Sequence, residues 1–335
     1  MAAASQQIPS PLALIGLAPE QYERIIMKCA DRCSKNKVTC VGGANIDIQG
    51  FSNAAINMRD SNPGMIRLCP GGVGRNIAEN IARMGADVRM VSAVGEDSFG
   101  RIILESCAEA GIDVSGIEVL PGKRSSAYLV LTDSDGDMLA AISDMHIMKG
   151  LGADFILRHS EAFDSADAVV LDPNLSVESL ETLTSRWRHK PLFADPISTT
   201  YARTLRQFLP DLYMVKCNRQ EAEVFADMEI HTESEVEEAA DRMLKSGVNC
   251  SVITLGSNGV FYKDQSGLRL RKYHKPLEPV SATGAGDSFT GAMVCCWLKG
   301  YSPEASLELA MKAAEITIMD ERTVSFNIKS VFDRS

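Results

Sequence analysis

The chain has 335 residues, of which 45% are apolar and 23% charged, and its formal net charge is −10. This composition is ordinary for a soluble globular protein with one large domain or two small ones, and it excludes large-scale disorder. The negative charge argues against nucleic acid as a partner, because nucleic-acid binding needs a clustered basic face. No stretch of 18 or more apolar residues occurs, so we expect no membrane partner either.

Nine cysteines are scattered through apolar segments without a C-x-x-C pair. Zinc ligation would need short paired spacings, so buried reduced thiols are the better interpretation. The N-terminal region has no charged segment followed by a clean apolar run, and Pro9, Pro11 and Pro19 interrupt it. A signal peptide is therefore not expected. Reduced thiols favour the cytoplasm.

Residues 1–37 form an N-terminal extension in which apolar residues at helical spacing predict a short helix over 19–35. From residue 38 to about 330, strand-like apolar runs alternate with helical patterns. The predicted strands are 38–42, 88–94, 168–172, 191–194, 212–216 and 250–255, and the predicted helices include 74–85, 232–246 and 286–298. This alternation predicts an α/β domain with a parallel, doubly wound sheet.

Two segments, at about 46–70 and 123–146, carry strand-like patterns without helices between them. In the second segment, strands at 125–132 and 138–143 flank a polar turn over 133–137. Such strands predict a small sheet added to the main one, and a lid over a binding cleft is its natural use. An edge meander or a dimer-forming flap is the alternative.

The strongest chemical signal is Thr283-Gly284-Ala285-Gly286-Asp287, at the start of the last of these helices. Small residues let the backbone approach a ligand closely, and the N–H groups of a helix start attract anions. Asp287 is poorly placed to bind phosphate but well placed to accept a proton from a hydroxyl beside a transferring phosphoryl group. The alternative is a structural loop in which Asp287 interacts with the helix dipole.

Two common nucleotide-binding motifs are missing from the sequence. Gly72-x-Gly74 lacks the third glycine of a dinucleotide fingerprint, because Ile77 stands in its place. This disfavours an NAD-dependent oxidoreductase. No G-x-x-x-x-G-K-[ST] segment occurs either, so a nucleotide must be held in another way.

Polar residues follow two of the predicted strands. Asn218 and Glu221 open a helix, which suits a capping box, yet the same pair could position a hydrated magnesium ion at the strand end. Thr254, Gly256 and Gly259 end the next strand, where they form either a tight turn or contacts to phosphates.

A second group of polar residues follows the first strand. Asn45 and Asp47 alternate out of one face, which suits vicinal sugar hydroxyls, with turn chemistry as the alternative. Asn76 lies at a helix start, where it is either a further hydrogen-bonding group or a plain cap.

Taken together, these elements resemble the ribokinase-like (PfkB) family of sugar and nucleoside kinases over about residues 38–320. The motifs that carry the resemblance are, in chain order, Gly71-Gly72-x-Gly74-x-Asn76, Asn218-x-x-Glu221, Thr254-x-Gly256-x-x-Gly259 and Thr283-Gly284-Ala285-Gly286-Asp287. The resemblance implies a three-layer α/β/α core with a small β-sheet lid, often shared across a homodimer. It also implies ATP as co-substrate and Mg²⁺ as cofactor.

The resemblance further implies roles for single residues. Asp287 would be the catalytic base, with the amides of Gly284, Ala285 and Gly286 as an anion hole. Magnesium would be organised through water by Asn218 and Glu221, and the ATP site lined by Thr254, Gly256, Gly259 and Thr283. The substrate would contact Asn45, Asp47, Gly72 and Asn76, while lid residues Asp144 and Met145 would close on the base.

Within the family, segments 43–47, 61–64, 71–77, 143–145 and 195–198 resemble members that phosphorylate pseudouridine. That likeness implies phosphorylation of the 5′-hydroxyl of this nucleoside. The alternatives are a ribose or other nucleoside kinase of the same fold, or a non-catalytic nucleoside-binding protein. Potassium-activated members often carry an acidic residue where this chain has Ser281, so K⁺ is only weakly implied.

Overall fold

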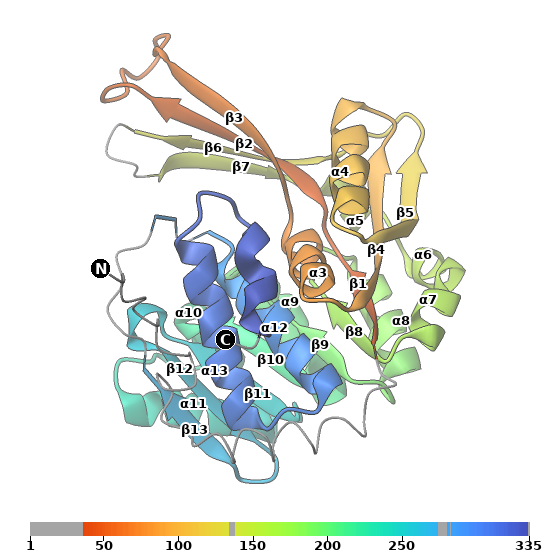
Figure 1. Ribbon diagram of the computed structural model, residues 1–335, viewed down its shortest axis with the longest axis vertical. Coiled ribbons are helices and arrows are strands. Elements are labelled where there is room, and N and C mark those ends of the chain that lie inside the picture. The colour runs from red at the N-terminus through yellow and green to blue at the C-terminus, as the bar shows by residue number, and fades with distance from the viewer. Residues whose placement is uncertain (1–35, 134–137, 274–279, 282, 334–335) are drawn as a thin grey trace, which may run out of the picture.

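The computed structural model describes residues 36–133, 138–273, 280–281 and 283–333. The helix predicted over 19–35 and most of the turn predicted over 133–137 lie outside these residues. The described chain forms one large sheet between two layers of helices, with a second small sheet projecting from it (Figure 1). This is the predicted three-layer α/β/α architecture.

The main sheet has nine strands in the order β13-β12-β11-β10-β9-β8-β1-β4-β5. Their bounds are β1 Lys37–Val41, β4 Asp87–Gly95, β5 Asp113–Leu120, β8 Ala168–Leu171, β9 Leu192–Ala194, β10 Met214–Asn218, β11 Cys250–Thr254, β12 Val260–Asp264 and β13 Arg269–Lys272. Neighbours from β11 to β5 pair in parallel, as predicted. The expectation of a wholly parallel sheet is wrong at one edge, where β12 and β13 pair antiparallel.

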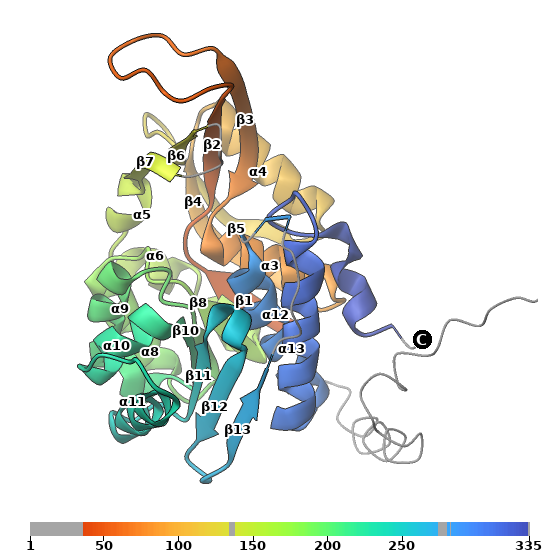
Figure 2. The same cartoon turned by 90° about the vertical axis from the view of Figure 1, so that its left-hand side faces the viewer.

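Helices cover both faces of this sheet (Figure 2). One face carries α3 Val73–Arg83, α4 Ser98–Glu109, α12 Ala285–Lys299, α13 Pro303–Ile318 and the 3₁₀ turn η3 Phe326–Val331. The other carries α5 His146–Lys149, α6 Ala153–Arg158, α7 Ser160–Ser165, α8 Val177–Trp187, α9 Thr199–Leu205, η1 Arg206–Asp211, α10 Arg219–Ala226 and α11 Glu233–Lys245. A short turn, η2 Gly256–Asn258, joins β11 to β12.

Two apolar cores lie on the two faces of the sheet, because successive side chains of a strand point in opposite directions. In β1, Cys40 packs with the α3 and α12 side, whereas Val41 packs with the opposite helices. In β8, Val170 and Leu171 divide in the same way. Burial on both faces explains why the central strands are continuously apolar and could be recognised from sequence.

The small sheet has the order β3-β2-β6-β7, with β2 Asn45–Ser52, β3 Gly64–Gly71, β6 Ser126–Thr132 and β7 Met138–Asp144. It projects beyond the main sheet (Figure 1). Strand β2 begins four residues after β1 ends, and β3 leads directly into α3. The small sheet therefore continues from the carboxyl end of β1, and the second sheet predicted from 46–70 and 123–146 is confirmed.

Candidate active site

The strand order of the main sheet reverses between β1 and β8. Ligands in open α/β sheets bind at such a switch point, outside the carboxyl ends of the strands. The buried carboxylate of Asp172, just after β8, accepts backbone N–H groups of Gly43 (2.8 Å), Gly74 (2.7 Å) and Asn174 (2.9 Å). Burial raises the pKa of Asp172 to about 6. Asp172 thus fixes the loops that surround the switch point.

Asp287 is the third residue of α12, and its side chain is half-buried. Gly284 caps this helix in the left-handed region, with φ +84°, and a Cβ there would collide with the carbonyl oxygen of Thr323. Position 284 therefore requires glycine. The first N–H groups of a helix have no partner within it, so the turn over 284–286 offers backbone donors beside Asp287.

The carboxylate of Asp287 is joined to α3 by one hydrogen bond, in which Asn76 Nδ2 donates to Oδ2 at 2.9 Å. Asn76 is the fourth residue of α3, whose N-cap is Gly72. The interpretation of Asn76 as a plain cap is therefore wrong. Its side chain instead connects two elements that lie 211 residues apart in the sequence.

The surroundings of Asp287 shift the pKa of its carboxyl group. Burial raises its pKa to about 7, and the nearby negative charges of Asp195 and Asp172 act in the same direction. The hydrogen bond from Asn76 and the positive charge of Lys216 oppose this shift. A carboxyl group with such a pKa is half-protonated near neutral pH, so it can accept and release a proton there.

Sequence reasoning missed a buried ion pair beside Asp287. Lys216 Nζ lies 2.7 Å from Asp195 Oδ2, which also accepts a 3.1 Å hydrogen bond from Thr290 Oγ1. A Cβ on Gly286 would lie 2.8 Å from Lys216 Nζ, so the ammonium group sits directly against the start of α12. Burial lowers the pKa of Lys216, but Asp195 outweighs this and the pKa stays above its usual value. A lysine inside the apolar strand Met214–Asn218 was the available signal.

The start of the small sheet contributes two more polar groups. Asn45 Nδ2 donates to Asp47 Oδ1 at 2.7 Å, which confirms that the two side chains share a face. Burial raises the pKa of Asp47, against the effects of Asn45 and Arg75. Gly72 has φ +98°, and a Cβ there would lie 2.9 Å from Asn45 Oδ1. A larger residue at 72 would displace this pair.

Asp144 is not brought onto the same face as Asp47, and Met145 lies just beyond the end of β7. The pairing registers align Ile46 with Ala127 and Asp144, and Asp47 with Tyr128 and Ser143. Because neighbouring rows point to opposite faces, Ser143 rather than Asp144 shares the face of Asp47. Asp144 Oδ1 instead lies 2.6 Å from His146 Nδ1. Both Asp144 and His146 line a cavity of about 220 Å³ at the base of the small sheet.

Asn218 and Glu221 form a complete capping box at the start of α10. The N–H of Glu221 donates to Asn218 Oδ1 at 2.9 Å, and the N–H of Asn218 donates to Glu221 Oε2 at 2.8 Å. The capping interpretation is confirmed. Burial and the charge of Asp195 raise the pKa of Glu221.

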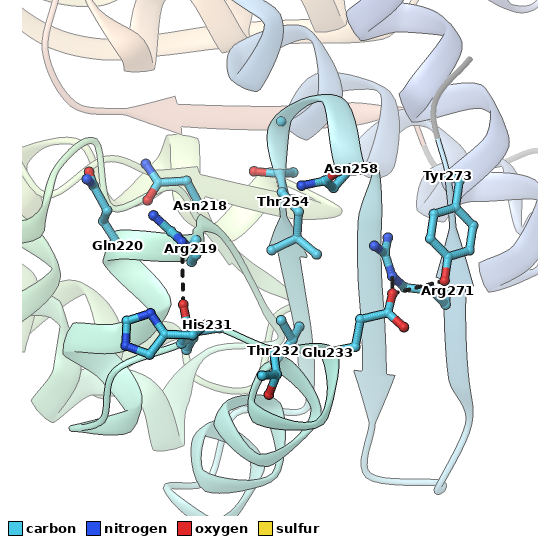
Figure 3. Close-up of a pocket in the computed structure, with 14 residues that line it drawn as sticks. Asn218, Arg219, Gln220, His231, Thr232, Glu233, Thr254, Asn258, Arg271 and Tyr273 are labelled. Carbon is cyan, nitrogen blue, oxygen red and sulfur yellow. Dashed lines mark hydrogen bonds and ion pairs between the residues drawn. The ribbon is translucent and has the colours of Figure 1, made fainter. Parts of the chain in front are cut away.

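A cavity of about 650 Å³ opens beside this capping box, at the carboxyl ends of β10 and β11. Figure 3 shows Asn218, Thr254 and Asn258 at these strand ends. Thr254 and Gly256 line the cavity, whereas Gly259 ends the turn before β12 with φ +89°. The tight turn predicted here is confirmed, since β11 and β12 form a hairpin. Thr283 lies exposed one residue before Gly284.

On the opposite wall, Glu233 Oε1 accepts hydrogen bonds from Arg271 Nε and from the hydroxyl of Tyr273, both at 2.9 Å (Figure 3). This group ties β13 to the start of α11. It closes the far side of the cavity with polar atoms.

Comparisons with known proteins place the chain in a family. The profile of the pfkB family of carbohydrate kinases matches residues 35–329. The chain is 34% identical to pseudouridine kinase from Escherichia coli over 289 residues, covering 86% of this chain and 92% of that protein. It is 32% identical to guanosine-inosine kinase from Exiguobacterium acetylicum over 290 residues, with coverages of 85% and 96%.

The chain belongs to the pfkB carbohydrate kinase family.

The fold agrees with this assignment. The structure of Arabidopsis thaliana ribokinase complexed with ribose and ATP superposes with a TM-score of 0.77 at 21% identity, covering 89% of this chain and 97% of that one. Members of the pfkB family are phosphotransferases that typically use ATP and Mg²⁺. The present pfkB kinase is therefore a kinase of nucleosides or sugars.

The pfkB kinase offers a magnesium ion few direct ligands of its own. Among the described residues, no cluster of three or more His, Cys, Asp or Glu side chains could hold a metal ion. The capping box already engages Asn218 Oδ1 and Glu221 Oε2. A site with so few direct protein ligands suits Mg²⁺, which keeps several waters and binds through one or two carboxylates and substrate phosphates.

Among the described residues, no helix combines the length and the apolar character that crossing a bilayer requires.

Proposed function

We propose that this pfkB kinase transfers the γ-phosphoryl group of ATP to the 5′-hydroxyl of pseudouridine. The products are pseudouridine 5′-phosphate and ADP. The observation that carries the proposal is the carboxylate of Asp287, whose pKa of about 7 is set by its surroundings and which stands beside the backbone donors of the α12 start. Phosphoryl transfer depends mainly on positioning and electrostatics, and this site supplies both.

Asp287 acts as the general base. It accepts the proton of the 5′-hydroxyl while the oxygen attacks the γ-phosphorus, and the bond to the β-phosphate oxygen breaks to release ADP. General-base catalysis of this kind contributes about 10²–10⁴-fold to rate. A base with a pKa near 7 suits this task, because it is ionised in a large share of molecules yet still binds a proton well.

Negative charge that develops on the transferring group is met by two features of the α12 start. The amides of Gly284, Ala285 and Gly286 form the anion hole, aided by the helix dipole. Lys216 adds a fixed positive charge, since its ammonium group lies against Gly286 and is held in place by Asp195. Residues on strand β10 and helix α12 thus act on one phosphoryl group.

Asn218 and Glu221 hold Mg²⁺ through water molecules in this proposal. The bound ion would neutralise phosphate charge and orient the β- and γ-phosphates. The protein's own contribution is the capping box, which fixes the carboxyl group of Glu221 against Asn218, a residue that lines the proposed ATP cavity. Thr254 and Gly256 line that cavity. Gly259 and Thr283 are assigned to the ATP site from the family resemblance.

The ribose hydroxyls bind Asn45, Asp47 and Asn76, with the backbone of Gly72 close by. The hydrogen bond between Asn45 and Asp47 fixes the donor and acceptor pattern that the sugar meets. Asp144 lies at the base of the lid, where it lines a cavity of about 220 Å³ together with Lys123, and Met145 is the next residue in the chain. We propose that closure of the small sheet brings this end of the lid over the nucleobase.

The choice of substrate rests on the comparisons. Two nucleoside kinases are 34% and 32% identical to the chain, whereas ribokinase from Haemophilus influenzae is 25% identical over a similar share, which favours a nucleoside over a free sugar. The identity with pseudouridine kinase, 34%, favours pseudouridine over a purine nucleoside. Inosine is the second candidate, because the guanosine-inosine kinase aligns almost as well.

We further propose that the lid sheet pairs with a second copy of the chain. Its two edge strands, β3 and β7, expose Ile66 (75%) and Ile142 (66%). Unpaired sheet edges that carry exposed apolar side chains favour association with another strand. A second copy offers the same edges, so a homodimer would satisfy both.

The test of the substrate is ADP release with Mg²⁺ and ATP against pseudouridine, uridine, inosine and ribose in parallel. We expect turnover with pseudouridine at least about tenfold above the other three in kcat/KM. Preference for inosine or ribose would retain the kinase and reject pseudouridine. Release of ADP with none of the four, alongside nucleoside binding, would support a non-catalytic binding protein.

A further inference from the structure

Arg75 is a buried arginine on α3 to which no role has been assigned above, and it is 4% exposed. Its guanidinium group is held from several sides. Nη1 donates to Asn76 Oδ1 at 2.9 Å and to the carbonyl oxygen of Pro70 at 3.3 Å. Nη2 donates to Ser106 Oγ at 2.7 Å and pairs with the carboxylate of Glu79. The group therefore links the end of β3, helix α3 and helix α4.

The contact with Asn76 decides which way its amide points. A guanidinium group only donates hydrogen bonds, so Arg75 can bind the oxygen of this amide but not its nitrogen. With Oδ1 held by Arg75, Nδ2 faces Asp287 and donates to it at 2.9 Å. The reversed amide would place Oδ1 against the Asp287 carboxylate and Nδ2 against the guanidinium, and both contacts would repel.

A contribution to the stability of the fold does not by itself explain why a charged residue is buried at position 75. Burying an ion pair costs desolvation that its attraction often only offsets, so apolar residues of similar size would serve as well. The charge of Arg75 is balanced by Glu79, which also pairs with Arg83 Nη2 at 2.6 Å. The charge of Arg75 also acts to lower the pKa of Asp47, against the larger effect of burial. The guanidinium group does one further thing, which is to fix the orientation of the Asn76 amide and so of its hydrogen bond to Asp287.

We infer that Arg75 is a positioning residue for phosphoryl transfer, which orients the Asn76 amide so that it donates to the carboxylate of Asp287. This inference rests on the proposed role of Asp287 as the base. The groups that face Asp287 are Asn76 on α3, Lys216 on β10, Asp195 after β9 and Asp172 after β8. Among these, Asn76 and Lys216 favour the ionised carboxylate; Asp195 holds Lys216, whereas Arg75 orients Asn76.

The first test is Arg75→Lys, with Arg83→Lys as the matched control. Lysine keeps the positive charge beside Glu79 but cannot hold Asn76, Ser106 and Glu79 at once. We expect kcat to fall about tenfold, the effect of losing one hydrogen bond to a charged group. The acid limb of the kcat–pH profile should also move to higher pH, because Asp287 loses a donor that lowers its pKa.

Arg83→Lys alters the other arginine that pairs with Glu79, and Arg83 has no contact with Asn76 among its hydrogen bonds and ion pairs. It should leave kcat and the acid limb near their wild-type values. A purely structural Arg75 would lower the melting temperature of Arg75→Lys and leave its acid limb in place. That result would overturn the inference.

A double-mutant cycle with Asn76→Ala sharpens the test. If Arg75 acts through Asn76, adding Arg75→Lys to Asn76→Ala should change kcat by less than about twofold. Additive losses would contradict the inference. If Arg75→Lys does not fold, Asn76→Ala alone carries the test, because an acid limb that this variant leaves unmoved would show that the Asn76 amide does not act on Asp287.

The proposed function and this inference fail in different ways. Absence of turnover by the wild-type protein, or full turnover by Asp287→Asn, would reject the base itself. Normal wild-type turnover that depends on Asp287 but not on Arg75 would reject the inference alone.

Discussion

At the scale of single residues, the site places a carboxyl group where its ionised form is costly. The pKa of Asp287 is raised to about 7, so the folded protein binds a proton there more tightly than the unfolded chain does. Ionisation of Asp287 therefore reduces stability as the pH rises from its unfolded value near 4 through 7. A residue kept at such a cost is best explained by catalysis.

The raised pKa of Asp287 predicts how activity depends on pH. Protonated Asp287 cannot accept the hydroxyl proton, so kcat should fall as the pH decreases through about 7. The measurement is kcat at saturating ATP, Mg²⁺ and nucleoside between pH 5.5 and 9, a range chosen to bracket this pKa. A rate that stays flat down to pH 5.5 would show that Asp287 is already ionised or takes no part.

The proposed role of Glu221 in magnesium binding can be tested against a control variant in a second capping box. Glu221→Gln removes one charge and leaves a residue that can still complete a capping box. We expect the Mg²⁺ concentration at half-maximal rate to rise several-fold, because the nearby carboxylate is lost. Glu235→Gln makes the same change in the capping box of α11, formed with Thr232, and should not alter the Mg²⁺ titration. Equal titrations for both variants would remove Glu221 from metal binding.

At the scale of elements, the start of α12 is held against a distant part of the chain. Gly284 contacts the carbonyl oxygen of Thr323, beyond the end of α13. Asp320 anchors that segment through hydrogen bonds from Arg322 and Ser325. The position of the proposed anion hole therefore depends on the segment after α13, although the two are separated in the sequence.

Gly284→Ala should test this dependence. The added Cβ meets both an unfavourable φ of +84° and the Thr323 carbonyl, so the α12 start should shift and kcat should fall at least about tenfold. Gly267→Ala is the control, since Gly267 has φ +87° but no atom within 4 Å of the added Cβ. It should lose some thermal stability and keep its kcat. Similar kcat values for the two variants would show that the Thr323 contact does not position the site.

Elements with a simple pattern could be predicted from the sequence, and those set by long-range contacts could not. Helix α12 and strand β8 were found because their apolar residues are continuous or periodic. Strand β12 was missed, since a five-residue strand after a tight turn carries little pattern of its own. In the site, Asp287 stood out through its small neighbours, but Lys216 reaches Asp195 only through strand pairing. Of the two interpretations of Asn76, the sequence could not decide between a hydrogen-bonding group and a plain cap, because its partner Asp287 is 211 residues away.

At the scale of the whole molecule, the small sheet carries several apolar side chains that are exposed to solvent. Ile66 on β3 and Met138 and Ile142 on β7 are all more than 60% exposed. A lid that closes on its own cleft would leave the two sheet edges free. Pairing with a second copy would cover them and would couple closure of one site to the other.

This proposed association predicts the mass of the protein in solution. The wild-type chain should elute with twice its mass of 36.3 kDa, and Ile142→Lys should shift it toward the monomer, because a charge on the edge strand opposes pairing. Val177→Lys alters an exposed apolar residue on α8, away from the small sheet, and should remain dimeric. Light scattering after size exclusion gives the masses. A monomeric wild-type protein would rule out the dimer.

The most direct measurement is to identify the product of the complete reaction by phosphorus–proton correlation spectroscopy. The assay contains ATP, Mg²⁺ and pseudouridine, with wild-type protein and Asp287→Asn in parallel. The account predicts a phosphate coupled to the C5′ hydrogens of pseudouridine, formed at least about 10²-fold more slowly by the variant. A phosphate on another hydroxyl, or equal rates for the two proteins, would contradict it.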